Sequence, residues 1–311
     1  MKHYMKKKIK IFITGHKGLL GNAILKQLSK RKNIKVIIAE RKKLDLENYQ
    51  ALFKWFKKNR PDFVINAAAK AGGIEDNDKY PVDYMMVNIK IQTNLIYLSH
   101  KFKVKKFMFI GSSCIYPKFS KVPIKETELL KGELEPTNQW YAITKIHGVK
   151  LCEAFKKQYG SNFSCVMPTN LFGPNDKYDE RSHVIPALIK RMHHAKLNKD
   201  LNVKVWGDGR PKREFLYVED CAKIICKILM SSKYQKLINI GTGRDITIKK
   251  LAETIKKIVG FKGKLIFDKK MPNGVMRKTM DISKIKKFKY DKFTDFEKAL
   301  KLTYKDFLRG N

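Results

Sequence analysis

A phenol and an ammonium group stand four residues apart near the middle of the chain, at Tyr141 and Lys145. Residues 138–159 have helical spacing, which places both side chains on one face of the predicted helix. A nearby cation lowers the pKa of a phenol, so Tyr141 could exchange a proton with a carbonyl or an alcohol. Ser112 and Ser113 follow an apolar, strand-like segment, and a hydroxyl there could hydrogen-bond the same oxygen. This spacing alone is common on structural helices, and only the neighbouring motifs favour the chemical interpretation.

A second motif is rich in glycine. Gly15, Gly18 and Gly21 have the spacing Gly-x-x-Gly-x-x-Gly between a strand-like segment, residues 10–14, and a helix-like one, residues 22–32. Glycines in this position allow a tight turn and a close approach of the backbone to a pyrophosphate, which the helix N-terminus stabilises. Many turns need glycine, so the weight of the motif comes from its place between strand and helix. It predicts a dinucleotide site.

The residues after the second predicted strand bear on the choice of dinucleotide. NAD-binding folds usually offer an acid near the end of that strand, whereas the 2′-phosphate of NADP needs a cation. Glu40 is followed by Arg41, and Lys17 lies in the glycine loop, so we expect NADP(H) with Arg41 and Lys17 at the phosphate. Glu40 argues for the opposite choice, and the cations could instead be solvated residues of a lysine-rich chain.

Alternating strand-like and helix-like segments must position these residues. Five predicted strands (residues 10–14, 35–39, 63–69, 106–111 and 164–167) alternate with four predicted helices (22–32, 49–59, 88–102 and 138–159). Repeated units of this length indicate a parallel sheet covered by helices on both faces. We therefore predict the α/β class, with a Rossmann-type doubly wound parallel sheet and a smaller, mixed α/β substrate-binding lobe.

The second half of the chain is less regular and divides less clearly. We expect residues 9–170 with 214–241 to form the NADP-binding domain, and residues 171–213 with 242–311 to form the substrate lobe. The boundary depends on whether residues 237–240 return to the sheet.

Four longer motifs resemble those of the GDP-L-fucose synthases, a family of extended short-chain dehydrogenase/reductases. They are Gly-Ser-Ser-Cys-Ile-Tyr-Pro at 111–117, Leu-Glu-Pro-Thr-Asn at 134–138, Pro-Thr-Asn-Leu at 168–171 and Ser-His-Val-Ile-Pro at 182–186. The resemblance runs from about residue 10 to about residue 281. It implies conversion of GDP-4-keto-6-deoxy-mannose to GDP-L-fucose, by epimerisation at C3 and C5 followed by NADPH-dependent reduction at C4.

The resemblance also assigns the catalytic roles. It implies that Cys114 is the base and His183 the acid of epimerisation, on opposite faces of the sugar. A thiol near a cationic cofactor and a histidine can be partly ionised near neutral pH. In the reduction, Tyr141 protonates the C4 oxygen, Lys145 holds the cofactor ribose and tunes Tyr141, and Ser112 orients the oxygen.

Further contacts follow from the same resemblance. The expected cofactor contacts are Gly15, His16, Lys17, Gly18, Leu19, Leu20, Gly21, Arg41, Asp45, Leu46, Ala67, Ala68, Ala69, Ile110, Ser112, Tyr141, Lys145, Pro168, Asn170, Leu171 and His183. The expected substrate contacts are Ser113, Asn138, Arg191, Trp206, Arg213 and Lys278. The family implies a homodimer in which residues 88–102 and 138–159 pair as a four-helix interface. Ala39 stands where the family has a basic residue, which leaves the strength of the NADP preference open.

Two other functions remain alternatives. A sugar-nucleotide 4-epimerase or dehydratase with tightly held NAD shares the glycine loop, the tyrosine and the lysine, but lacks the pair Cys114 and His183 in these motifs. A non-catalytic dinucleotide sensor would not need Ser112, Tyr141 and Lys145 together.

Composition excludes several other classes. The 311 residues carry a formal net charge of +38, but the lysines are spread along the chain without a base-reading motif, so we expect no nucleic-acid partner and an attraction for anionic substrates. The five cysteines are odd in number and widely spaced, which predicts neither a disulfide framework nor a metal site. No apolar run is long enough for a membrane span or a signal peptide, so we expect a cytoplasmic protein.

Overall fold

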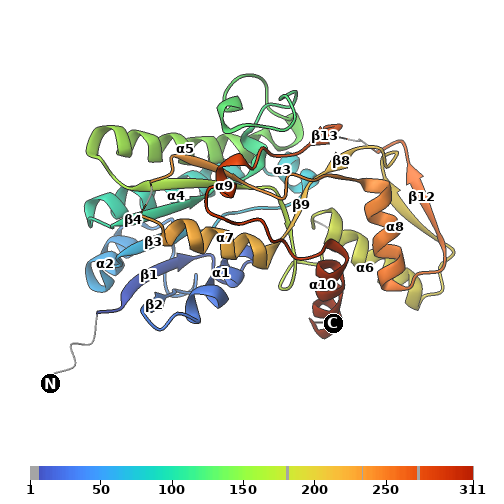
Figure 1. The fold of residues 1–311 in the computed structure, drawn as a ribbon, viewed down its shortest axis with the longest axis horizontal. Coiled ribbons are helices and arrows are strands. Elements are labelled where there is room, and N and C mark those ends of the chain that lie inside the picture. Colours follow the sequence, from blue (N-terminus) through green and yellow to red (C-terminus); the bar gives the residue numbers. More distant parts are fainter. Residues whose placement is uncertain (1–6, 180–181, 233, 272–273, 311) are drawn as a thin grey trace.

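The centre of the molecule is a parallel sheet of six strands in the order β10-β5-β4-β3-β1-β2 (Figure 1). The computed structural model describes residues 7–179, 182–232, 234–271 and 274–310. The strands are β1 (Ile9–Thr14), β2 (Ile34–Ile37), β3 (Phe63–Asn66), β4 (Lys106–Ile110), β5 (Phe163–Pro168) and β10 (Leu237–Ile240). Every pairing between neighbours is parallel. This confirms the predicted fold class, and β10 does return to the sheet.

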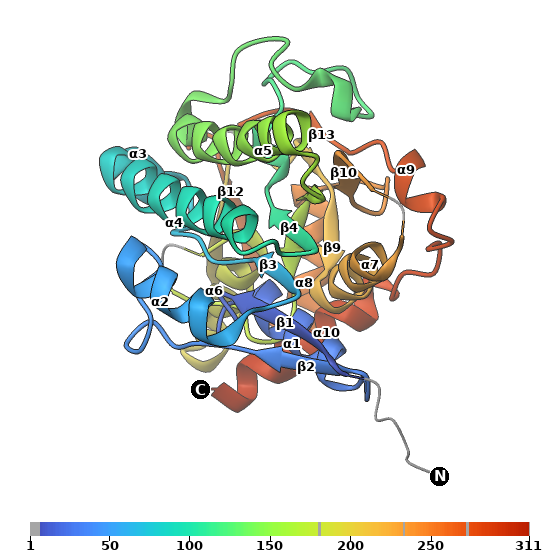
Figure 2. The same ribbon diagram turned by 90° about the vertical axis from the view of Figure 1, so that its left-hand side faces the viewer.

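Helices cover both faces of the sheet, which explains why most residues of its strands are apolar (Figure 2). Along β1, Ile11 and Ile13 point to the face covered by α1 (Leu19–Ser29) and α7 (Val218–Met230), and Phe12 points to the other. The opposite face is covered by α2 (Tyr49–Asn59), α4 (Pro81–Lys101) and α5 (Gln139–Tyr159).

A third hydrophobic core lies away from the large sheet. Its helices are α6 (Val184–Leu197), α8 (Ile248–Val259) and α10 (Phe296–Gly310), and they pack together around side chains such as Leu188, Leu251 and Phe307 (Figure 1). Its strands are β6 (Asn170–Phe172) with β9 (Phe215–Tyr217), β7 (Asn202–Trp206) with β12 (Lys264–Asp268), and β8 (Lys212–Arg213) with β11 (Ile246–Thr247) and β13 (Arg277–Lys278).

Shorter helices complete the described chain. They are α3 (Ile74–Lys79), α9 (Ser283–Lys286) and the 3-10 turns η1 (Ser113–Ile115), η2 (Glu126–Glu128) and η3 (Pro136–Asn138). Helix α4 begins seven residues earlier than its hydrophobic spacing predicts, because Pro81 fits the first helical position and needs no backbone donor there. None of the helices in the described ranges is long and apolar enough to cross a membrane.

All six parallel strands end at the same edge of the sheet. The glycine loop follows β1, Ala67 follows β3, Gly111 follows β4 and Thr169 follows β5. Ligands of doubly wound sheets bind outside the carboxyl ends of the strands, so this edge is where the candidate site is built.

Candidate active site

The glycine loop forms a cradle that side chains would fill. Gly15 has φ +69°, and a Cβ added to it would lie 2.6 Å from the carbonyl oxygen of Ala67. A Cβ on Gly21 would lie 2.6 Å from the carbonyl carbon of Gly15, and closer still to its oxygen. The side chain of His16 is buried in this loop, and its Nδ1 has no hydrogen-bond partner in the described protein. A tight cradle and an unsatisfied nitrogen fit a dinucleotide at this place.

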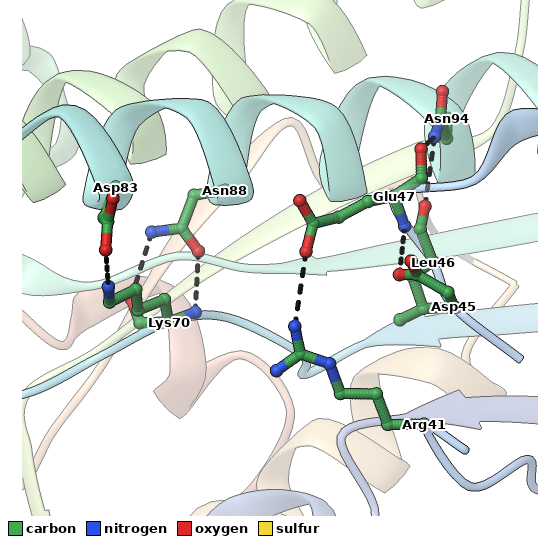
Figure 3. A network of polar contacts seen from close by, with 8 residues as sticks. All are labelled: Arg41, Asp45, Leu46, Glu47, Lys70, Asp83, Asn88 and Asn94. Carbon is green, nitrogen blue, oxygen red and sulfur yellow. Dashed lines mark hydrogen bonds and ion pairs between the residues drawn. The ribbon is translucent and has the colours of Figure 1, made fainter.

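The strand ends next to the loop are fixed by side-chain hydrogen bonds. The hydroxyl of Thr14 donates to Oδ1 of Asn66 at 3.0 Å, and the backbone N–H of Ala68 donates to the same oxygen at 3.2 Å. Asn88 on α4 holds the next part of the chain, because its Oδ1 accepts a hydrogen bond from the backbone N–H of Lys70 at 2.8 Å (Figure 3). The segment 67–69 is therefore held beside the glycine loop.

Both cations expected at a 2′-phosphate, Lys17 and Arg41, form ion pairs with carboxylates. Lys17 Nζ lies 2.8 Å from Oε1 of Glu40, and Lys17 lowers the pKa of that carboxyl. Arg41 Nη2 lies 3.5 Å from Oε1 of Glu47 (Figure 3). Because exposed pairs of this kind are worth only about 0–1 kcal/mol, a phosphate can displace either carboxylate.

Asp45 and Leu46, two of the expected cofactor contacts, lie beside helix α4. Asp45 Oδ1 accepts from the backbone N–H of Glu47 at 3.0 Å, and Asn94 Nδ2 donates to the carbonyl of Leu46 at 3.0 Å (Figure 3). Asp45 and Leu46 are thus positioned by one turn and one helix side chain.

Helix α5 places Tyr141 and Lys145 together, as its spacing predicts. Lys145 Nζ lies 5.4 Å from the centre of the Tyr141 ring and donates to the carbonyl of Ile110 at 2.9 Å. Burial lowers the pKa of Lys145 to about 8. Burial raises the pKa of Tyr141, and Cys114 and Tyr84 raise it further. The expectation of a lowered phenol pKa is therefore wrong for the protein alone, because desolvation by burial is the largest effect on this group and raises its pKa.

The thiol of Cys114 lies in the same cluster, directly after β4. It is buried in η1, and its backbone N–H contacts Oγ of Ser112 at 3.4 Å. Burial raises the pKa of Cys114, while the positive charges of Lys278 and Lys145 and a hydrogen bond from Ser112 oppose that rise. The protein alone does not supply the partial ionisation that the sequence suggested, because desolvation is the largest effect.

Two basic residues near this site, Lys278 and Arg213, lie on the short strands β13 and β8. Lys278 on β13 lies opposite Arg213 on β8 in the parallel register. Burial lowers the pKa of Lys278, whereas Cys114 and Glu135 raise it. Burial also lowers the pKa of Arg213, and Glu135 raises it. A charge interaction therefore connects the thiol to Lys278, which in turn interacts with Arg213, and both basic residues are expected substrate contacts.

The remaining predicted residues lie on elements around this cluster. His183 is the N-cap of α6 and is exposed, and loss of hydration lowers the pKa of its imidazole. Arg191 donates from Nη1 to the carbonyl of Lys204 at 2.9 Å, and Trp206 ends β7 with 48% of its surface exposed. Within the described residues, no hydrogen bond or ring contact joins the side chains of His183, Arg191 and Trp206 to Cys114 or Tyr141. Asn138 has a buried Oδ1 that accepts no hydrogen bond from any residue that the structure describes.

Sequence reasoning missed a buried acid next to Arg213. Glu214 is fully buried. Its carboxylate accepts hydrogen bonds from the backbone N–H groups of Thr242, of Gly243 at 2.7 Å and of Met280 at 2.7 Å. Burial raises its pKa, and these hydrogen bonds oppose the rise. Glu214 thereby ties β8, the end of β10 and the end of β13 together. Its place directly after Arg213 was the available signal.

Comparison with known proteins agrees with this architecture. Residues 11–241 match the model of the "NAD dependent epimerase/dehydratase family". The GDP-L-fucose synthase of Sinorhizobium fredii is 45% identical, over 96% of this chain and 95% of the relative, and that of Escherichia coli is 43% identical, over 97% and 98%. A solved GDP-L-fucose synthetase from Naegleria fowleri bound to NADP superposes with a TM-score of 0.89 at 29% identity, over 98% and 96% of the two chains. The chain therefore belongs to the NAD dependent epimerase/dehydratase family, in the group of the GDP-L-fucose synthases.

Proposed function

We propose that this protein converts GDP-4-keto-6-deoxy-mannose to GDP-L-fucose, by epimerisation at C3 and C5 and then reduction at C4. Two relatives that match nearly the whole chain are named GDP-L-fucose synthase. One observation carries the proposal at the level of the site. The buried thiol of Cys114 lies near enough to Lys145 on α5 and Lys278 on β13 for both positive charges to lower its pKa. Proton exchange and reduction can therefore act on one bound sugar.

NADP(H) is the proposed cofactor, and its bound form supplies the hydride that reduces C4. Support comes from the glycine cradle, the unsatisfied Nδ1 of His16 and the NADP bound by the Naegleria fowleri relative. We assign the 2′-phosphate to Lys17 and Arg41, released from their carboxylate partners. The other proposed contacts are those expected from the sequence: Leu19 and Leu20 at the start of α1, Ala67 and Ala69, Ile110, and Pro168, Asn170 and Leu171.

In the proposed epimerisation, the thiolate of Cys114 removes the proton from C3, and the C–H electrons form an enolate on the C4 oxygen. His183, as imidazolium, then returns a proton to the opposite face of the carbon. Once Cys114 has lost its proton to solvent and His183 has taken one up, the same exchange follows at C5, because both carbons adjoin the C4 carbonyl. Lys145 and Lys278 favour the thiolate, and the substrate diphosphate favours the imidazolium that loss of hydration disfavours.

In the proposed reduction, Tyr141 donates its phenolic proton to the C4 oxygen as the new C–H bond forms. The raised pKa of Tyr141 keeps the phenol protonated at neutral pH, which suits a donor in this direction. Lys145 holds the cofactor ribose, and Ser112 hydrogen-bonds the carbonyl or enolate oxygen.

Substrate binding is assigned to cations and an exposed indole. Arg213 and Lys278 pair with the diphosphate, for which a guanidinium offers a forked contact. Trp206 packs on the base or sugar. Arg191 adds a further positive charge, while Ser113 and the unsatisfied Oδ1 of Asn138 provide polar contacts.

We further propose the domain division 9–170 with 214–241 for NADP and 171–213 with 242–311 for the sugar nucleotide. We also propose a homodimer formed by α4 and α5, which pack together through Gln92 and Thr144 (Figure 2). Val82 and Met86 on α4 are 69% and 51% exposed, which supports a covered face in the dimer. Five free cysteines suit the reducing cytoplasm, which is the proposed location.

The test is direct. Purified protein receives GDP-4-keto-6-deoxy-mannose and NADPH, and the product is identified by NMR. We expect one NADPH oxidised for each GDP-L-fucose formed. A rearranged sugar nucleotide without net consumption of NADPH would refute the proposal in favour of a 4-epimerase.

A further inference from the structure

A short segment after β6 touches both the glycine loop and the C-terminal helix. Asn175 lies in this segment with φ +68°, a left-handed conformation that asparagine tolerates better than most residues. Its side-chain Nδ2 donates to the carbonyl of Lys17 at 3.0 Å, and its backbone N–H donates to Oδ2 of Asp306 on α10 at 2.6 Å. One residue thus joins parts of the chain more than 130 residues away on either side.

The far side of this segment is anchored on α10. The hydroxyl of Tyr178 donates to the carbonyl of Thr303 at 3.2 Å, and its ring centre lies 4.7 Å from that of Phe307. Phe307 is buried in the third hydrophobic core. The segment is therefore held by α10 at Asn175 and again at Tyr178.

The same segment leads to His183. The hydroxyl of Ser182 donates to the carbonyl of Lys177 at 2.6 Å, and the backbone N–H of Asp179 donates to the Ser182 oxygen at 2.8 Å. Ser182 immediately precedes His183, the N-cap of α6. These hydrogen bonds link the part of the segment that follows Asn175 to the residue before the imidazole.

We propose that Asn175 is a positioning residue, which couples occupancy of the glycine loop by the dinucleotide to the placement of His183 for the sugar nucleotide. This inference rests on the proposed function, which puts the dinucleotide in the loop and His183 at the sugar. Lys17 carries the contacted carbonyl and lies between glycines whose backbone would approach the pyrophosphate. Each ligand then favours the loop geometry that the other needs, and the coupling is reciprocal.

The experiment measures this coupling as a ratio. Calorimetry gives the Kd of GDP-L-fucose, which carries the hexose that His183 would contact, with and without saturating NADP⁺, for the parent protein and for Asn175→Gly and Asn175→Asp. The glycine relaxes the backbone and carries no charge, whereas the aspartate keeps the side-chain shape, so only loss of the amide donor is common to both. Asn198→Gly, at the exposed C-cap of α6, is the matched control.

We expect NADP⁺ to tighten GDP-L-fucose binding in the parent and in Asn198→Gly. Both Asn175 variants should lose about 2- to 10-fold of that tightening, which is the worth of one net hydrogen bond. Unchanged coupling in both variants would overturn the inference, as would a parent protein that binds both ligands independently. Failure of the parent to bind NADP⁺ or GDP-L-fucose at all would instead refute the proposed function.

Discussion

The substitution Gly21→Ala tests the glycine cradle with a single methyl group. The new Cβ would lie 2.6 Å from the carbonyl carbon of Gly15, where ordinary contact begins at 3.4 Å. The three nearest atoms are all backbone, so no side chain can move aside, and helix α1 must separate from the loop by more than about 0.8 Å because the Gly15 oxygen is nearer than the carbon.

The cost of that separation has two parts. Overpacking of this kind destabilises by about 1–3 kcal/mol, which for a chain of this size lowers the Tm by roughly 2–10 °C. Displacing backbone donors from a charged phosphate removes a further ~1.5–3 kcal/mol from dinucleotide binding. We therefore expect NADPH affinity to fall by about 10- to 100-fold.

Two alanine substitutions serve as matched controls. At Gly18 the added Cβ lies 3.4 Å from the Gly15 oxygen and φ is −79°, so the free protein should tolerate it while NADPH binding still weakens. At Gly132 the added Cβ meets Pro117 at 3.4 Å, far from the loop in sequence, and neither quantity should change. Thermal unfolding and NADPH fluorescence titration measure the two effects separately. A Gly21→Ala protein with the parent Tm and the parent NADPH affinity would refute the reasoning.

Three further predictions concern the buried acids and the catalytic pair. Cys114→Ser should mainly slow solvent deuterium exchange at C3 and C5, while Tyr141→Phe should mainly slow NADPH oxidation; parent behaviour of both variants would contradict the assigned roles. Burial and the neighbouring Asp179 and Asp306 raise the pKa of Asp176 to about 7, so the folded state binds its proton more tightly than the unfolded state. Asp176→Asn should therefore gain stability relative to the parent as the pH rises from about 4 to 7, by up to about 1–3 kcal/mol. Denaturant unfolding at several pH values measures this difference in unfolding free energy. A difference that does not change with pH would contradict the prediction. Glu214→Gln places an N–H donor among backbone donors and should lower the unfolding free energy by about 1–3 kcal/mol in urea titrations; an unchanged midpoint would show that the buried carboxylate is not a structural tie.

Periodicity and motif order predict the large sheet because that information is local. Residues 49–59 form a helix as predicted, and the spacing of Tyr141 and Lys145 puts both on α5. The short strands β8 and β13 are two residues each, too short to leave a pattern, yet they align Arg213 with Lys278 across 65 positions. Pairings of this kind depend on the tertiary fold and leave no local signal.

Electrostatics could not be predicted for the same reason. The sequence identifies Lys17 and Arg41 as cations near a phosphate, but not the carboxylates that contact them. The spacing of Tyr141 and Lys145 suggests a lowered phenol pKa, whereas burial of the phenol raises it. Residue types set the sign of each charge interaction, and only the fold sets the desolvation that opposes it.

The most direct test of the central claim is a crystal structure of the protein with NADP⁺ and a GDP-linked analogue of the keto sugar. The account predicts Sγ of Cys114 against one face of the hexose ring, the imidazole of His183 against the other, and C4 facing the nicotinamide within reach of the Tyr141 hydroxyl. A bound sugar with Cys114 and His183 on the same face, or with either one out of contact with the ring, would contradict it.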